Sequence, residues 1–207
     1  MVNPDARFPF PAALCTSVNE QVVHGIPGDR ALRNGDIVSI DCGVRLGGYC
    51  GDAAVTIAIG QVAPEVARLM RVTLRSLELA IERSRPGVMW SEIARAVQSF
   101  VEGERFSVVR DFVGHGIGRD LHEDPKVPNY WDRKRRNKDF RLVEGMVLAI
   151  EPMVNMGTAA VEYGDGDRWV VVTKDRRAAA HYEHTIAITA AGCDVLTRGN
   201  GVMARAV

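Results

Sequence analysis

The sequence predicts a mixed α/β fold of the α+β kind, in which residues 1–207 form a single domain made of two related units. Three observations predict it. Short runs rich in Val, Ile and Thr, bounded by turn residues, are typical of antiparallel strands. Residues 64–102 instead carry apolar side chains at helical spacing. A weak internal repeat relates residues 19–60 to residues 107–190, so we expect a pseudo-two-fold relation between the halves.

The composition is that of a globular protein with a sizeable core. Of 207 residues, 46% are hydrophobic and 25% are charged. The 26 basic residues equal the 26 acidic residues in number, which argues against binding to DNA or to a membrane surface. The chain holds no apolar run long enough for a membrane span, and its N-terminus lacks the features of a signal peptide. We therefore expect a monomeric cytoplasmic protein with no DNA or membrane partner.

The cysteines support the same compartment. None of them shows the CxxC spacing of a redox or zinc motif. We interpret them as reduced thiols rather than as a disulfide, as is usual for proteins of the cytosol. The four are Cys15, Cys42, Cys50 and Cys193.

Residues 34–59 predict a hairpin, and it carries the first functional signal. β-branched residues dominate both arms, and the only turn signal between them is Leu46-Gly47-Gly48. A two-residue loop centred on Leu46 and Gly47 places Asp41 directly opposite Asp52, with Cβ atoms about 5 Å apart. Like charges opposite one another are destabilising unless a cation lies between them. The hairpin therefore predicts a metal site.

Two helices should follow the hairpin. The first runs over residues 64–83, with Pro64 in its first turn and Pro86-Gly87 behind its end. The second runs from Ser91, a plausible N-cap, to about Glu102. We interpret the apolar stripes of both helices as core packing.

The remainder of the chain reads as strands and loops. Residues 107–123 predict a strand that leads into a glycine-rich loop with His115 and His122, and further strands are expected over 144–155, 169–173 and 181–189. The segment 131–141 is strongly basic, and we interpret it as a solvated loop, with a ribosome or other partner contact as the alternative. Its basic residues are Arg133, Lys134, Arg135, Arg136, Lys138 and Arg141.

The internal repeat doubles the acidic signal of the hairpin. NGDIVSID (34–41) matches EGMVLAIE (144–151), and VTIAI (55–59) matches HTIAI (184–188). Each unit thus supplies two carboxylates, from Asp41 and Asp52 in the first and from Glu151 and Glu183 in the second. The second unit also has a helical pair ahead of its strands, whereas residues 1–18 stand in that place in the first. We therefore expect the helical cover of the first unit to be missing from this chain, which would leave an apolar sheet face exposed.

Four strand carboxylates with one histidine from the glycine-rich loop make an oxygen-rich site. Such a donor set suits two hard or borderline divalent ions rather than a thiolate zinc site. Two ions that share bridging carboxylates and a hydroxide can activate water and polarise a carbonyl. We interpret the two histidines beside Glu183, His181 and His184, as structural.

Several segments together resemble the type I methionine aminopeptidases, from about Phe10 to Thr197. They are CTSVNEQVVHGIP, NGDIVSIDCG with GYCGD, GHGIGRDLHEDP, MVLAIEPMVN and VVTKDRRAAAHYEHTIAIT. The resemblance implies the pita-bread fold, a pseudo-two-fold curved antiparallel sheet with helices on its outer face. It implies removal of the N-terminal methionine from nascent chains whose second residue is small, with two divalent ions (Co, Mn, Fe or Zn) bridged by a hydroxide.

The resemblance also implies roles for individual residues. The metal ligands would be Asp41, Asp52, His115, Glu151 and Glu183. Among them, Asp52 and Glu183 would bridge both ions, and Glu151 would also shuttle a proton. His122 would stabilise the tetrahedral intermediate, and His24 would assist substrate binding and catalysis. The methionine pocket would be lined by Phe10, Cys15, Leu121 and Trp169.

The chain departs from the family pattern in three places, and two alternatives stay open. Leu121 replaces an aromatic residue of the pocket wall, so selectivity should be looser. The loop 131–141 is more densely charged than is usual for the family, and the N-terminal helical pair and first strand are missing. The first alternative is a related Xaa-Pro peptidase of the same fold. CTSVNE and the short spacing from His122 to Glu151 favour the methionine enzyme. The second alternative is a truncated, non-catalytic chain that binds a metal or a partner.

Overall fold

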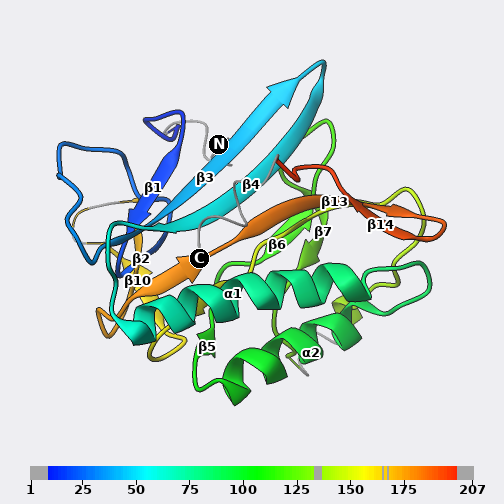
Figure 1. Ribbon diagram of the computed structural model, residues 1–207. Helices are drawn as coiled ribbons and strands as arrows, with labels where there is room; N and C mark the ends of the chain where they lie inside the picture. The colour runs from blue at the N-terminus through cyan, green and yellow to red at the C-terminus, as the bar shows by residue number, and fades with distance from the viewer. Residues whose placement is uncertain (1–8, 133–136, 165, 167, 200–207) are drawn as a thin grey trace.

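The computed structural model describes residues 9–132, 137–164, 166 and 168–199 as a curved antiparallel sheet with two helices on one face (Figure 1). The eight-stranded main sheet has the order β1-β3-β4-β13-β8-β6-β7, with β14 beside β13, and two three-stranded sheets adjoin it. The strands are β1 (Cys15–Val18), β2 (Gln21–Val23), β3 (Ile37–Leu46), β4 (Tyr49–Ala58), β5 (Ser107–Val108), β6 (Gly114–Gly116), β7 (Glu123–Val127), β8 (Val147–Ile150), β9 (Met153–Asn155), β10 (Val161–Tyr163), β11 (Val171–Thr173), β12 (Ala179–His181), β13 (Glu183–Thr189) and β14 (Gly192–Val195), and the helices are α1 (Pro64–Arg83) and α2 (Trp90–Gly103).

The hairpin β3–β4 is present, but its register differs from the prediction by two residues. The turn residues are Gly47 and Gly48, with φ of 59° and 85°, because a tight turn of this hand needs two consecutive residues in the left-handed region. Asp41 therefore faces Ala54, and Asp52 faces Gly43, so the predicted direct opposition is wrong. Since side chains alternate with a period of two, a shift of two keeps both aspartates on the same face.

Both predicted helices are confirmed, with one correction at a helix start. α1 begins at Pro64 and ends at Arg83, as predicted. α2 begins at Trp90, so Ser91 lies in its first turn and is not the N-cap. The carboxylate of Asp139, from a segment far along the chain, accepts a 3.0 Å hydrogen bond from the backbone N–H of Ser91. This distant acceptor supplies what a local cap usually supplies.

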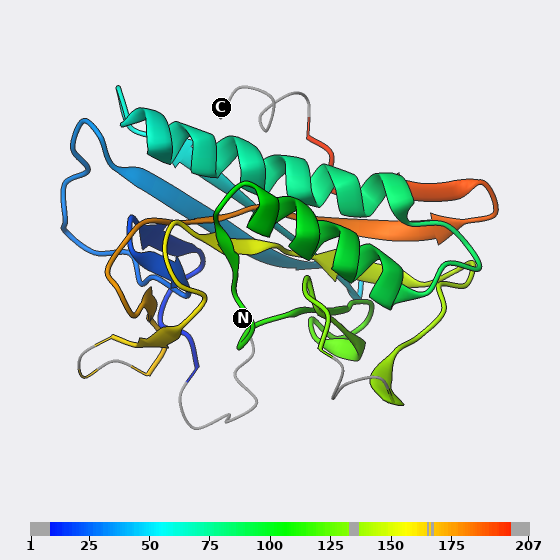
Figure 2. The same cartoon turned by 90° about the horizontal axis from the view of Figure 1, so that it is seen from below.

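Both helices lie on one face of the sheet (Figure 2). Ile186, Ile188 and Leu148 belong to the core that the helices share with β8 and β13. Glu183 and Thr185 alternate with them and point to the opposite face. Because cross-strand partners share a face, the side chains of Asp41, Asp52 and His115 lie on that opposite face as well.

Two strands that the sequence predicts as continuous are interrupted beside acidic residues. The predicted strand 144–155 divides into β8 and β9, with Glu151 and Pro152 between them. A proline cannot donate to the ladder, which ends β8 there. The predicted strand 181–189 divides at Tyr182 into β12 and β13. At Glu151 the chain passes from the main sheet to a small sheet, and at Tyr182 it returns from that small sheet to the main sheet.

The outer face of β3–β4 is apolar, and near the turn it is exposed. Val44, Leu46 and Tyr49 are 52%, 82% and 58% exposed. Nearer the centre of the sheet, Ile40 and Val55 share this face and are half-buried.

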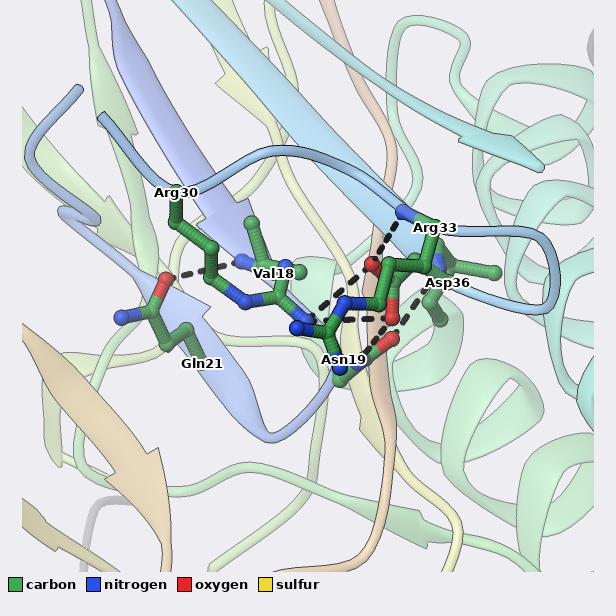
Figure 3. A network of polar contacts seen from close by, with 7 residues as sticks. Val18, Asn19, Gln21, Arg30, Arg33 and Asp36 are labelled. Carbon is green, nitrogen blue, oxygen red and sulfur yellow. Dashed lines mark hydrogen bonds and ion pairs between the residues drawn. The ribbon is translucent and has the colours of Figure 1, made fainter. Parts of the chain in front are cut away.

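A hydrogen-bond network fastens the loop between β2 and β3 to the turn after β1 (Figure 3). The Asp36 carboxylate accepts hydrogen bonds from the side chain of Asn19 at 2.8 Å, the backbone of Arg33 at 2.9 Å and the side chain of Arg30 at 3.1 Å. These donors, with Asn19 the largest contributor, lower the pKa of Asp36 to about 2. The network thus ties Arg30, Arg33 and Asp36 in the loop before β3 to Asn19.

Neither helix in the described part of the chain is both long enough and apolar enough to cross a lipid bilayer.

Candidate metal centre and substrate pocket

Three side chains from strands of the main sheet converge on its polar face. Asp52 on β4, His115 on β6 and Glu183 on β13 each offer one ligand atom, and these atoms lie within 4.8 Å of one another. All three residues are buried, with exposures of 5%, 7% and 2%. Two carboxylates and one imidazole at this separation form a candidate site for a metal ion.

The other two residues that the resemblance implies as ligands lie at the same place. The carboxylate of Asp41 hydrogen-bonds to that of Asp52. Its Oδ1 atom is buried and has no hydrogen-bond partner among the residues that the structure describes. Glu151 places Oε1 3.5 Å from Nε2 of His115. The structure thus brings all five residues together from four segments of the chain.

The protonation of the carboxylates reflects the cost of burying them near one another. Burial raises the pKa of Asp41 to about 8, and the charge of Asp52 adds to the shift. Burial also raises the pKa of Asp52 to about 6. The pKa values of Glu151 and Glu183 are raised as well, first by burial and then by the neighbouring carboxylates. Four such groups are stable in their charged form only when a cation compensates them.

These donors fit a divalent metal. The oxygen atoms suit hard cations, and a single imidazole extends the range to borderline transition metals. His115 is prepared as a neutral ligand, because burial lowers its pKa to about 4. Its Nδ1 lies 2.9 Å from the carbonyl oxygen of Gly116. If Nδ1 carries the proton and donates a hydrogen bond to that carbonyl, Nε2 is unprotonated and directs its lone pair at the carboxylates.

A cavity of about 840 Å³ opens beside this cluster. Among the residues predicted to contact substrate, it is lined by His24, Leu121, His122 and Trp169. The ring of His122 lies 4.3 Å from that of His115, centroid to centroid. Burial lowers the pKa of His122, which keeps its imidazole neutral near pH 7.

The other two residues predicted to line the methionine pocket, Phe10 and Cys15, are not among those that line the cavity. Phe10 meets Trp169 edge-on at 5.3 Å and supports the wall of the cavity. Cys15 is buried on β1, opposite Asp41, and burial raises the pKa of its thiol. His24 packs edge-on between Trp169 and Phe112, at 5.9 and 5.8 Å.

His181 lies closer to the cluster than the sequence interpretation implied. Its ring is 2% exposed, and Nε2 lies 4.0 Å from Oε2 of Glu151, with no hydrogen-bond partner in the described part of the chain. Residues two apart on a strand lie on the same face, so the spacing of His181 and Glu183 in the sequence could have indicated that His181 faces the cluster. His184, in contrast, points to the other face and hydrogen-bonds to Thr197 at 2.8 Å.

The basic segment is described only in part. Residues 133–136, which include Arg133, Lys134, Arg135 and Arg136, lie outside the described residues. Lys138 is exposed, and the guanidinium of Arg141 donates a hydrogen bond to the carbonyl of Gly87.

Known proteins share this architecture. The sequence profile of metallopeptidase family M24 matches residues 3–190. Methionine aminopeptidase 1 of Bacillus subtilis (strain 168) is 52% identical over 189 residues, which span 91% of this chain and 75% of that protein. The crystal structure of methionine aminopeptidase from Rickettsia prowazekii is 42% identical and superposes with a TM-score of 0.86 over 91% of this chain and 75% of the other.

A more distant neighbour shares the fold alone. The Xaa-Pro dipeptidase from Bacillus anthracis superposes with a TM-score of 0.70, at 19% identity, over 91% of this chain and 47% of its own. Together the superpositions confirm the predicted pita-bread fold.

Proposed function

The chain belongs to metallopeptidase family M24, and from this membership we propose that it hydrolyses the first peptide bond of polypeptides that begin with methionine. One observation carries the proposal: Asp52, His115 and Glu183 converge on one sheet face, with Asp41 and Glu151 beside them, next to a cavity of about 840 Å³. The identity of 52% to a methionine aminopeptidase supports this substrate over others of the family.

The cofactor belongs to the proposal. Asp41, Asp52, His115, Glu151 and Glu183 would hold two divalent ions, with Co, Mn, Fe and Zn as the candidates. Ions held there activate water and polarise the scissile carbonyl. The orphaned oxygen of Asp41 and the raised pKa values of the acids support a cation at this place.

The residues around the cavity bind and orient the peptide. His122 is neutral near pH 7, so one ring N–H remains to donate a hydrogen bond to the carbonyl oxygen as it gains charge. His24, held between two aromatic rings, contacts the substrate backbone. Glu151 accepts a proton from water and passes it to the leaving amine. Apolar walls from Trp169 and Leu121 suit a thioether side chain.

The biological setting is also proposed. The substrates are nascent polypeptides whose second residue is small, and the protein acts as a cytoplasmic monomer. A ribosome contact through residues 133–141 rests on the sequence alone.

The purified full chain should be incubated with Met-Ala-Ser and with an Ala-Pro peptide, with each candidate metal added in turn. We expect free methionine from the first and no cleavage of the second. Glu183→Gln should lose activity, whereas Glu82→Gln, on the exposed face of α1, should keep it. Cleavage of Xaa-Pro bonds alone would support the alternative peptidase. A chain that binds metal but turns over neither peptide would support the non-catalytic alternative.

A further inference from the structure

The seam between the two halves of the molecule runs between β4 and β13, which carry Asp52 and Glu183. Only two residue pairs form the backbone ladder across it, Glu183 with Ala54 and His184 with Ala53. The same register, continued beyond this ladder, places Thr185 opposite Asp52 one step away on one side and Thr56 opposite His181 two steps away on the other. At both positions a threonine hydroxyl makes the contacts that backbone groups otherwise make.

The hydroxyl of Thr185 forms hydrogen bonds to both the backbone N–H and the backbone carbonyl of Asp52. Oγ1 accepts a hydrogen bond from the N–H of Asp52 at 2.9 Å and donates one to its carbonyl oxygen at 2.8 Å. Thr56 does the same to His181, at 2.9 Å from N–H and 2.8 Å to the carbonyl. Both threonines are buried, with exposures of 1% and 0%. Each hydroxyl therefore replaces a full pair of ladder hydrogen bonds.

The arrangement is built twice by the internal repeat. Thr56 and Thr185 occupy the same position in VTIAI (55–59) and HTIAI (184–188). Thr185 bonds to Asp52, which lies four residues before Thr56. In the same way, Thr56 bonds to His181, which lies four residues before Thr185. The seam thus has the same pseudo-two-fold relation as the carboxylates beside it.

Further bonds hold the hydroxyl of Thr56 in place. Its single hydrogen is donated to His181, so Ser39, whose Oγ lies 2.8 Å away, must donate to it. The phenol of Tyr182 donates to the backbone carbonyl of Thr56 at 2.9 Å. Tyr182 directly precedes Glu183, so this network also fixes the backbone from which that carboxylate projects.

We propose that Thr56 and Thr185 are positioning residues, whose hydroxyls hold the two strands apart at the separation that places Asp52 and Glu183 on a shared metal. A hydroxyl inserted between two backbones keeps the strands further apart than a direct ladder does. Removing it leaves the polar groups of Asp52 unsatisfied or lets β4 and β13 shift. The inference rests on the proposed metallopeptidase function, and it concerns the geometry of the ligands rather than the chemical step.

Three variants test the inference by their affinity for Co²⁺, measured by calorimetric titration, and by the visible absorption of bound Co²⁺. Thr185→Val keeps the shape and removes the hydroxyl, and Thr185→Ser keeps the hydroxyl. Thr73→Val is the matched control, because Thr73 is equally buried but donates its hydroxyl to Leu69 inside α1. Loss of a group that orients metal ligands commonly weakens metal binding by about 10–100-fold.

We expect Thr185→Val to weaken Co²⁺ binding by at least about tenfold and to change the Co²⁺ spectrum. Thr185→Ser and Thr73→Val should bind as the unaltered chain does. Wild-type affinity and spectrum in Thr185→Val would overturn the inference, as would an equal loss in Thr73→Val. If Thr185→Val does not fold, Thr185→Cys keeps the volume with a weaker donor and must show the same direction of change.

The two proposals fail in different ways. An unaltered chain that binds Co²⁺ but releases no methionine from Met-Ala-Ser would refute the proposed function, and the effect of the threonines on affinity and spectrum would still be measurable. An active enzyme whose Thr185→Val variant binds Co²⁺ normally would refute only the positioning role.

Discussion

Divalent metal should raise the thermal stability of this protein far more at pH 8 than at pH 6. The reason lies in the carboxylates, which must be deprotonated to bind a cation. Burial raises the pKa of Asp41 to about 8 and that of Asp52 to about 6. Below pH 8 a metal must therefore displace a proton from Asp41, and its apparent affinity falls as the pH falls.

The magnitude follows from mass action. A ligand at about one hundred times its Kd stabilises the folded state by about 2.7 kcal/mol. For a chain of this size, about 1 kcal/mol corresponds to roughly 2–4 °C in Tm, so the expected rise at pH 8 is roughly 5–11 °C. Because the metal must displace one proton from Asp41, its apparent affinity falls by up to about tenfold for each unit by which the pH is lowered. At pH 6 the same metal concentration is then near Kd, which leaves about 0.4 kcal/mol, or roughly 1–2 °C.

The metal-free protein should show the opposite trend. A carboxyl whose pKa is raised on folding stabilises the fold below its unfolded value, and that contribution is lost as the pH rises through the folded value. The metal-free chain should therefore lose stability between about pH 4 and pH 8, the window set by Asp41. Calorimetry of chelator-treated protein, with and without Co²⁺ or Mn²⁺, measures both trends.

Two variants sharpen the measurement. Asp41→Asn should reduce the metal-induced rise in Tm and flatten its dependence on pH, whereas Glu82→Gln on the exposed face of α1 should leave both unchanged. An equal or larger rise at pH 6 than at pH 8 in the unaltered chain would refute the reasoning.

Three further predictions concern single side chains. His122→Ala should lower kcat by about 10²–10³-fold, as for other lost donors to a developing oxyanion, with little change in Co²⁺ affinity; an equal loss of affinity would contradict this role. Leu148→Ala, at a fully buried core position, should lower the free energy of unfolding by about 2–5 kcal/mol in urea titrations, and a smaller loss would mean that the core collapses around the gap. Asp36→Asn should lower Tm at pH 7, but the difference from the unaltered chain should shrink as the pH falls from about 4 to about 2, because the pKa of Asp36 is lowered to about 2 by Asn19 and its neighbours. A difference in Tm that does not depend on pH would contradict that account.

Much of the candidate site could be predicted because strand periodicity is local. Asp41 and Asp52 lie in apolar β-runs, and alternation puts them on one face both in the predicted register and in the observed one, because the two registers differ by two residues. The two residues of the turn were predicted wrongly. Leu46-Gly47 and Gly47-Gly48 are both tolerable pairs by composition, and only the second supplies two residues with positive φ.

Other features required contacts between distant segments. The start of α2 is completed by Asp139, which lies 48 residues after Ser91. His181 approaches Glu151 only because β12 and β9 pair and the chain bends at Tyr182 and at Pro152. No spacing rule within one segment identifies such partners.

The class of fold, the two helices, the internal repeat and the acids and histidines that could hold a metal were all predictable from the sequence. Each of these depends on periodicity or on matching segments, which are properties of residues near one another in the chain. The tertiary structure alone decided that β4 lies beside β13 and that threonine hydroxyls bridge the seam between them, with Thr185 on Asp52 across 133 residues. The physical reason is that this pairing closes a long loop, and its stability depends on the packing of the whole sheet rather than on any local preference.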